Sequence, residues 1–213
     1  MSIPNSVHAV WVGGNPYPEK EKQLITINQK LLNECGFTYK VWTEEDIYQA
    51  LPADSIARQF FDFCLERKKY AFASDIVKTY LLYTIGGWVV DADNEFLKSP
   101  ITFAGLNWVS GFENYKGHTS PITAVMGAIP QHRFSKLLLD TYGANNFEDI
   151  ISLPNTQWIS SYLINHGGNK SNQRFYSQDY DVDIFPCDYF CGPEITDNTI
   201  ALHHFSGSWL PKA

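Results

Sequence analysis

Residues 73–93 read ASDIVKTYLLYTIGGWVVDAD, and this stretch decides the fold class. Apolar residues in its first part recur at helical spacing, which predicts a helix over 75–85 with Ser74 as its N-cap. The glycines at 86–87 end this helix, because glycine tolerates the left-handed backbone found at helix ends. An apolar strand at 88–90 follows and runs directly into an Asp-Ala-Asp motif.

The segments on either side of this stretch alternate between strands and helices. Before it, we expect strands at 3–12 and 37–42, a helix at 19–35, and helical segments over 44–70 that are interrupted near Pro52. The order β, α, β, α, α, β favours an α/β fold with a central, mostly parallel sheet flanked by helices. In the second half, the expected elements are strands at 106–112, 122–128, 181–185 and from 200, and helices at 133–142 and 157–165.

Length, charge and cysteine content narrow the classes of function. The chain has 213 residues, of which 44% are hydrophobic, and this is enough for one sizeable domain. Its 16 basic and 23 acidic residues give a net charge of −7, which argues against a nucleic-acid partner. No apolar run is long enough to predict a transmembrane segment, and no signal-peptide pattern is present. The four cysteines lack metal-binding spacing, so we expect reduced thiols in a cytoplasmic protein.

Asp91 and Asp93 are the strongest candidates for chemistry. Two carboxylates at the end of a buried strand can converge on a hard divalent cation, and ligands of α/β sheets bind at the carboxyl ends of strands. A second Asp-x-Asp sequence, at 181–183, is interpreted as structural, because alternation places its two acids on the outer face of a strand.

Asp75 and Lys78 lie three residues apart on the expected helix and therefore share one of its faces. They are open to two interpretations. One is a surface ion pair of little energetic value. The other has Asp75 bonding sugar hydroxyls while Lys78 places positive charge beside the sugar or a diphosphate.

Trp11 precedes Gly13 and Gly14 at the end of the first expected strand. The glycines would let the backbone approach a ligand closely, and an exposed Trp ring could stack on a nucleobase. The alternative is a tryptophan of the core.

Two adjacent histidines, His203 and His204, stand near the end of the sequence. A histidine beside two aspartates makes a mixed nitrogen and oxygen site, which suits Mn²⁺ better than Mg²⁺. Ser208 and Trp209 could reach phosphate oxygens from the loop that follows. Neither a Gly-x-Ser-x-Gly elbow nor a Walker motif is present, which removes the common hydrolase and kinase interpretations.

Taken together, these motifs resemble a known family, and they occur in its order. The segments that carry the resemblance are Ile3-Pro4-x-x-Val7-His8-x-x-Trp11-x-Gly13-Gly14, Tyr39-Lys40-Val41-Trp42, Ala73-Ser74-Asp75-Ile76-x-Lys78, Gly86-Gly87-x-x-x-Asp91-x-Asp93 and Asn198-Thr199-x-Ala201-x-His203-His204-x-x-x-Ser208-Trp209. The chain resembles the DXD-containing sugar-binding glycosyltransferases (glycosyltransferase family 32). That family includes relatives of fungal α-mannosyltransferases, bacterial capsular and lipopolysaccharide transferases, and the catalytic core of clostridial glucosylating toxins.

The resemblance implies a single, minimal domain of the GT-A type, which is Rossmann-like, over residues 1–213. Residues 1–100 would bind a nucleotide sugar, and 101–213 would bind the acceptor and supply a C-terminal loop for the metal and diphosphate. The implied activity is the metal-dependent, retaining transfer of a hexose from a UDP-sugar to a glycan or lipid-linked saccharide in polysaccharide biosynthesis. A lipid-linked acceptor would place the protein at the inner face of the membrane. The implied cofactor is Mn²⁺ or Mg²⁺.

The resemblance also assigns residues to roles. It implies Asp75, Asp91 and Asp93 as catalytic residues, and Asp91, Asp93 and His204 as metal ligands, with His203 as the alternative to His204. The implied donor-binding residues are Val10, Trp11, Val12, Gly13, Asp75, Lys78, Asp91, Ser208 and Trp209.

Three departures from the family pattern concern the donor sugar. Lys78 stands where Arg is usual, Val89 where Tyr is common, and Thr123 where Asn is frequent. Lysine keeps the charge of arginine but loses its bidentate fork.

The sequence is also compatible with two functions other than glycosyl transfer. A nucleotide-sugar hydrolase would use the same site with water as the acceptor. A non-catalytic carbohydrate-binding subunit would have no need to keep the acids and histidines named above.

Overall fold

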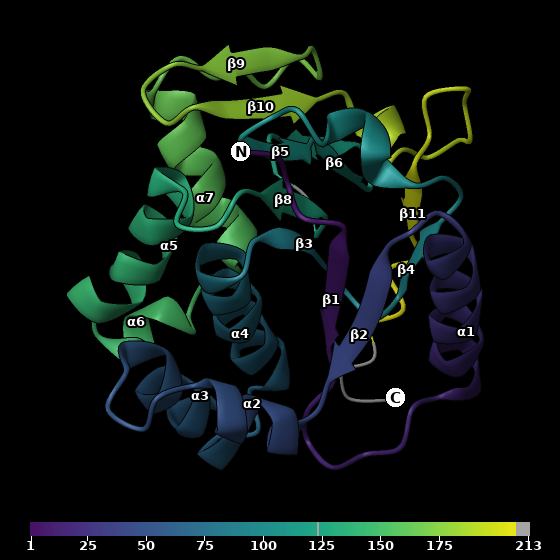
Figure 1. Ribbon diagram of the computed structural model, residues 1–213. Coiled ribbons are helices and arrows are strands. Elements are labelled where there is room, and N and C mark those ends of the chain that lie inside the picture. The colour runs from purple at the N-terminus through teal and green to yellow at the C-terminus, as the bar shows by residue number, and fades with distance from the viewer. Residues whose placement is uncertain (123, 208–213) are drawn as a thin grey trace.

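The computed structural model describes residues 1–122 and 124–207. A seven-stranded sheet of order β2-β1-β3-β8-β5-β10-β9 passes through the described part of the chain (Figure 1). The strands are β1 (Ser6–Val10), β2 (Thr38–Trp42), β3 (Gly87–Val90), β4 (Asn94–Phe96), β5 (Trp108–Gly111), β6 (Glu113–Tyr115), β7 (His118–Ser120), β8 (Met126–Ala128), β9 (Phe175–Ser177), β10 (Val182–Phe185) and β11 (Ala201–His203). The helices are α1 (Glu19–Glu34), α2 (Glu44–Ala50), α3 (Ile56–Glu66), α4 (Tyr70–Thr84), α5 (Arg133–Ala144), α6 (Phe147–Ile150) and α7 (Asn155–Asn165), with short 3-10 turns η1 (Pro100–Phe103) and η2 (Cys187–Tyr189).

The sheet is parallel in its first half and mixed in its second. Strand β1 pairs in parallel with β2 and β3, as the βαβ order predicts. Strand β8 is antiparallel to both β3 and β5, so β3 and β5 point in the same direction. Strand β10 is parallel to β5, and the edge strand β9 is antiparallel to β10. The predicted α/β class, with a central, mostly parallel sheet, is confirmed.

Helices cover both faces of the sheet and create two cores. Helix α4 packs against β1 and β3 on one face, while α1 packs against β2 and β4 (Figure 1). Strand β3 alternates between the two cores: Val89 belongs to the core under α4, and Trp88 and Val90 belong to the core on the α1 side. A central strand that is buried on both faces needs this continuous apolar run.

Helix α4 begins earlier than expected. Its first residue is Tyr70 and its N-cap position is Lys69, so the prediction that Ser74 caps the helix is wrong. Residues before Ser74 already pack on the core, with Ala73 fully buried, and this burial extends the helix beyond its local capping signal. By contrast, Thr43 and Asp46 form a capping box at the start of α2, so this helix begins at its local capping signal.

Part of the second half also differs from the predictions. Only residues 126–128 of the expected strand at 122–128 are in β8, and β4, the β6–β7 hairpin and β9 were not predicted. Asp183 does not lie on an outer face, because it is buried and accepts a hydrogen bond from Arg174 (2.8 Å). The second Asp-x-Asp sequence is thus structural, as predicted, although for a different reason: Asp183 is buried and bonded within the protein.

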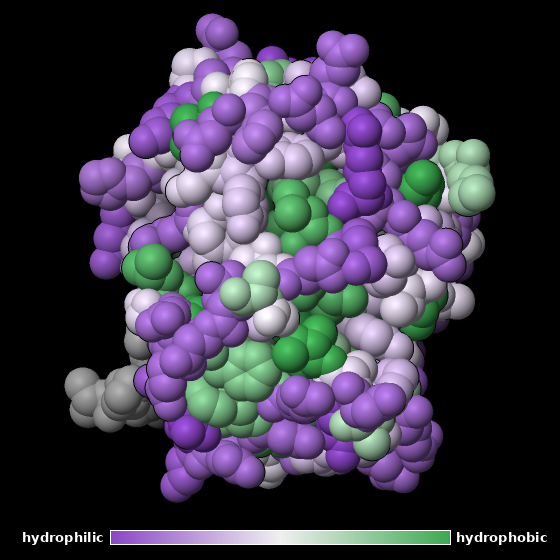
Figure 2. Space-filling model, turned by 90° about the vertical axis from the view of Figure 1, so that its left-hand side faces the viewer, coloured by the Kyte–Doolittle hydropathy of each residue, from purple (hydrophilic) through white to green (hydrophobic). Residues whose placement is uncertain are grey.

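The side of the molecule formed by α5, α6 and α7 has a hydrophilic rim around a hydrophobic area (Figure 2). Among the described residues, no helix combines the length and the apolar character needed to span a bilayer.

Candidate functional site

The Asp-x-Asp motif lies where β3 ends, next to the end of β1. In the β1–β3 pairing, Ala9 is opposite Val90, so the residues that follow these two strands are neighbours at one edge of the sheet. The chain turns sharply there, with the Asn94 N–H donating to the carbonyl oxygen of Asp91 (3.1 Å). This turn presents both aspartates beside the carboxyl end of β1, as the strand-end rule predicts.

The C-terminal part of the chain reaches the motif through a small antiparallel sheet of β4 and β11. Its register places His203 opposite Asn94, the residue immediately after Asp93. Two further hydrogen bonds join these segments: the His204 N–H donates to the Asp93 carbonyl oxygen (3.2 Å), and the Ser206 N–H donates to the side-chain Oδ2 of Asp93 (2.7 Å). Segments about 110 residues apart in sequence therefore form one site.

His203, rather than His204, faces the two aspartates. Its Nε2 lies 3.3 Å from Asp93 Oδ1 and 3.8 Å from Asp91 Oδ2. One ligand atom from each of these three residues lies within 4.8 Å of the others, which is close enough to converge on a metal ion. His204 instead pairs with Glu95, at 2.8 Å. Of the two histidines considered as metal ligands, the structure therefore brings His203 beside the aspartates, while His204 points to the other side, as adjacent residues of extended backbone do.

Charge interactions dominate the His203–Asp93 pair. Burial lowers the pKa of His203, but the interactions with the Asp93 carboxylate and the Cys191 thiol and the charge of Asp91 outweigh this effect and raise it to about 10. Burial likewise opposes ionisation of Asp93, yet His203 and the Ser206 N–H hold the pKa of Asp93 below its ordinary value. The pair is thus an ionised carboxylate beside a protonated imidazole at neutral pH.

Lys78 joins α4 to the motif. Only 3% of this residue is exposed, and its ammonium group bonds both Asp75 (3.0 Å) and Asp91. Burial disfavours the charged form of Lys78, but the two carboxylates outweigh it and raise its pKa, so the ammonium stays charged. The pair is therefore not a surface ion pair, because Lys78 is buried and bridges the two aspartates.

A small pocket with a volume of about 50 Å³ adjoins the motif. Its polar side has three carboxylates and the Lys78 ammonium, and its other side is largely aliphatic. Carboxylates bond sugar hydroxyls, while aliphatic groups pack on the C–H faces of a sugar ring. The lining residues are Asp75, Lys78, Asp91, Glu113, Ile122, Ala124, Met126, Asn155, Thr156 and Ile159.

Glu113 was not singled out from the sequence. It follows β5, which points in the same direction as β3, so it lies at the same edge of the sheet as Asp91. Burial raises the pKa of Glu113, while the charge of His203 opposes this shift. Polar residues that follow parallel strands gather at one edge of the sheet. This rule would have identified Glu113 if the direction of the strand expected at 106–112 had been known from the sequence.

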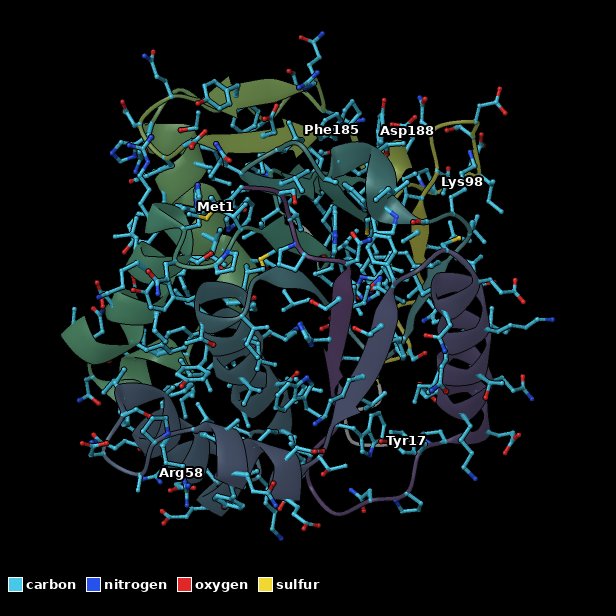
Figure 3. The ribbon with its side chains drawn as sticks, viewed as in Figure 1. Met1, Tyr17, Arg58, Lys98, Phe185 and Asp188 are labelled. Carbon is cyan, nitrogen blue, oxygen red and sulfur yellow. The ribbon has the colours of Figure 1, made fainter. Side chains whose placement is uncertain are left out.

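Trp11 is partly buried at the end of β1 and is not a residue of the core. Its ring packs against Tyr17, with centroids 5.0 Å apart, and its Nε1–H donates to the Asn15 carbonyl oxygen (2.8 Å). Tyr17, which lies beyond the carboxyl ends of β1 and β2 (Figure 3), was not predicted as a site residue. Gly13 adopts a left-handed backbone and donates its N–H to Glu44 (2.6 Å).

The other expected donor-binding residues fall into two groups. Val10 and Val12 bury their side chains in the core under α4, so only their backbones could face a ligand. Ser208 and Trp209 lie outside the described residues, as does Thr123.

Asn28 of α1 supports the site from behind. This fully buried side chain donates to the Asn94 carbonyl oxygen (2.8 Å) and accepts from the Phe96 N–H (2.7 Å). It thereby satisfies the edge of β4 that β11 does not cover. Since β4 carries the partner of His203, Asn28 holds the aspartates and the histidine in register.

Replacing Asn28 by leucine should reduce the free energy of unfolding by about 2–6 kcal/mol, because it leaves two buried backbone groups without partners at a cost of about 1–3 kcal/mol each. Urea unfolding would measure the change. Asn33→Leu, at an exposed position of the same helix, is the matched control and should stay within about 0.5 kcal/mol of the wild type. Equal effects of the two variants would contradict the role of Asn28.

Comparison with solved structures identifies the fold. The PaToxG glycosyltransferase structure matches with a TM-score of 0.55 at 17% identity. The match covers 76% of this chain and 69% of the PaToxG chain. A glycosyltransferase involved in the glycosylation of the major capsid of PBCV-1 matches with a TM-score of 0.52 at 9% identity, over 96% and 95% of the two chains. No family model and no curated protein matches the chain. The likenesses show a glycosyltransferase fold and confirm the expected GT-A-type architecture.

Proposed function

We propose that this protein is a metal-dependent, retaining glycosyltransferase. It moves a hexose from a nucleotide-sugar donor, a UDP-sugar, to a glycan or lipid-linked saccharide in the synthesis of a polysaccharide such as capsule or lipopolysaccharide. One observation carries the proposal: Asp91, Asp93 and His203 converge beside a pocket that also contains Asp75. The glycosyltransferase fold supports it.

The residues at the motif fit a divalent cation. Two carboxylate oxygens and one imidazole nitrogen form a mixed donor set that suits Mn²⁺, and Mg²⁺ less well. In this proposal Asp91, Asp93 and His203 hold the ion. When bound, it would stabilise negative charge on the departing nucleoside diphosphate.

The charge of the cluster favours the same conclusion. Among the described residues, its four carboxylates, those of Asp75, Asp91, Asp93 and Glu113, face two basic groups, Lys78 and His203. With all six charged, the cluster has four negative and two positive charges, which leaves two negative charges in a largely buried place. Burial accordingly raises the pKa of Asp75 and of Glu113. Buried charge is costly unless it is paired, and one divalent cation would balance it.

The protein's own side chains would position the donor sugar. Lys78 holds Asp75 and Asp91 at fixed positions, so their remaining oxygen lone pairs can accept from sugar hydroxyls without first being ordered. The aliphatic side of the pocket, including Ile122 and Ile159, would pack on the ring. The Trp11–Tyr17 pair at the same edge would stack on the nucleobase.

Retention of configuration follows from a front-face displacement in this proposal. The acceptor hydroxyl attacks the anomeric carbon from the side on which the diphosphate leaves. The bond from that carbon to the phosphate oxygen breaks, and the hydroxyl proton passes to the leaving phosphate. The protein orients the two reactants and excludes water.

The donor-binding part of the proposal predicts a metal requirement. In calorimetry with a panel of UDP-hexoses, at least one should bind in the presence of Mn²⁺, and its affinity should fall at least about tenfold in excess chelator. Restoring Mn²⁺ should restore binding. An affinity that is the same with and without the metal would contradict the site.

A further inference from the structure

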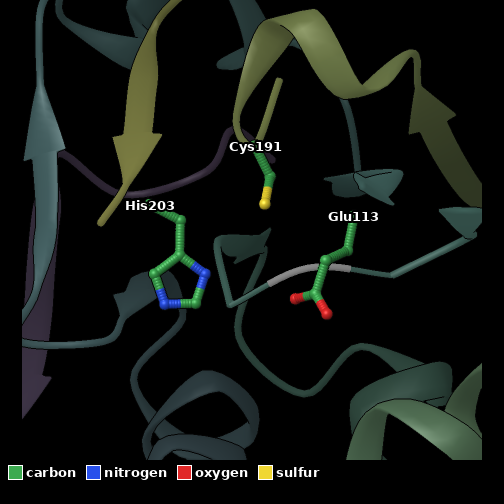
Figure 4. Close-up of side chains that lie close together, drawn as sticks. All are labelled: Glu113, Cys191 and His203. Carbon is green, nitrogen blue, oxygen red and sulfur yellow. The ribbon is translucent and has the colours of Figure 1, made fainter. Parts of the chain in front are cut away.

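A second cluster shares His203 with the proposed metal site. The ring turns its Nε2 towards Asp93, and Figure 4 shows that it turns its other nitrogen towards Cys191 and Glu113. One ligand atom from each of Glu113, Cys191 and His203 lies within 4.8 Å of the others. The three residues come from β6, from the segment after η2, and from β11, so three elements converge on this point.

Nδ1 of His203 is buried and forms no hydrogen bond of ordinary geometry within residues 1–122 and 124–207, and the Cys191 thiol is the group that interacts with the ring on this side. The histidine side chain is only 10% exposed. A buried polar atom without a partner is costly, and it indicates that a group is missing from its environment. Here the atom faces a thiol and a carboxyl group.

The ligand types indicate which cation fits. We propose that Glu113, Cys191 and His203 Nδ1 form a second metal site, selective for a thiophilic ion such as Zn²⁺. Zinc takes thiolate, imidazole and carboxylate ligands in tetrahedral geometry, with water in an open fourth position. With the usual zinc bond lengths, neighbouring ligand atoms lie roughly 3.3–3.7 Å apart. Since the three atoms lie within 4.8 Å of one another, the cluster needs to contract by at most about 1.5 Å. The Cys191 N–H donates to the Cys187 carbonyl oxygen (2.8 Å), which fixes the backbone that carries the thiol.

Asp93 completes this arrangement. A histidine that binds zinc usually donates its other ring N–H to a carboxylate, which fixes its orientation. His203 has this geometry, because its Nε2 lies 3.3 Å from Asp93 Oδ1 while Nδ1 faces the thiol. A cation would enter past Asp91, whose side chain is 35% exposed and which shares the pocket with Glu113.

The two sites exclude one another through His203. A neutral imidazole offers one nitrogen lone pair and one N–H, so it can hold a cation on Nε2 or on Nδ1 but not on both. Zinc on Nδ1 would remove His203 from the ion held by Asp91 and Asp93. This consequence, inhibition by zinc, rests on the proposed function, whereas the zinc site itself does not.

Co²⁺ serves as a spectroscopic probe for zinc, because cobalt thiolates absorb in the near ultraviolet. The reduced, metal-free protein should bind one equivalent of Co²⁺ with this absorption, and Zn²⁺ should displace it. Cys191→Ser should abolish the band and weaken Zn²⁺ binding at least about tenfold. Cys187→Ser, at a buried free thiol four residues away, is the control and should keep the band. The absence of a thiolate band in the wild type, or its persistence in Cys191→Ser, would overturn the proposal.

Two further variants separate this site from the first one. His203→Gln should lose the band, and it replaces Cys191→Ser as the test if that variant does not fold. Asp91→Asn should keep the band, since Asp91 is not a ligand of the second site. A band that disappears in Asp91→Asn would place the cobalt at the Asp-x-Asp motif and contradict the proposal. None of these measurements uses a nucleotide sugar, so they succeed or fail independently of the transferase assignment.

Discussion

Replacing Asp93 by asparagine should abolish metal-dependent glycosyl transfer while the protein remains folded. Asp93 contributes the Oδ1 that faces His203, and its Oδ2 accepts the Ser206 N–H (2.7 Å). The amide keeps the size of the side chain but removes the negative charge that a cation needs. Loss of several kcal/mol of transition-state stabilisation corresponds to a rate at least about 10³-fold lower. The measurement is release of UDP from the UDP-sugar that binds, with Mn²⁺ present.

Asp181→Asn is the matched control for this variant. Asp181 belongs to the second Asp-x-Asp sequence and bonds Tyr176 and Asn107. Its replacement should leave turnover within about twofold of the wild type. Circular dichroism and thermal unfolding would establish that both variants fold. Near-normal turnover in Asp93→Asn would contradict the assignment of Asp93 to the metal.

Replacing His203 and replacing His204 by glutamine should have very different effects on the affinity for Mn²⁺. His203→Gln should weaken Mn²⁺ binding at least about 100-fold, because it removes the imidazole that faces both aspartates. His204→Gln should change it less than about threefold, because His204 pairs with Glu95. Calorimetric titration of Mn²⁺ into each variant, at fixed UDP-sugar concentration, measures both affinities. A larger loss in His204→Gln than in His203→Gln would reverse the assignment made from the structure.

The sequence alone could not predict which of the two histidines faces the aspartates. The chemistry of His203 and His204 is the same, and only the register of β11 on β4 decides which one faces Asp93. A slip of one residue in a strand exchanges the two faces, and β4 itself is a three-residue strand with no pattern to predict it. The aspartates were predictable because a glycine pair, a buried strand and the motif are adjacent in sequence.

Other contacts of the site could not be predicted from the sequence because they join segments that are distant along the chain. Lys78 reaches Asp91 through space, so a local i,i+3 rule predicts its contact with Asp75 but not its bridging role. Glu113 and Cys191 meet His203 only after the second half of the chain has folded. The α/β class was predictable from periodicity, whereas the antiparallel insertion of β8 between β3 and β5 depends on tertiary packing.

The most direct test of the central claim is donor turnover by the wild-type protein. UDP release would be measured for a panel of UDP-hexoses with Mn²⁺, in chelator, and with and without a mixture of saccharide acceptors. We expect release that requires Mn²⁺ and becomes faster when an acceptor is present. Rapid release that no acceptor accelerates would instead identify a nucleotide-sugar hydrolase. No release from any UDP-hexose, or equal release in chelator, would contradict metal-dependent glycosyl transfer.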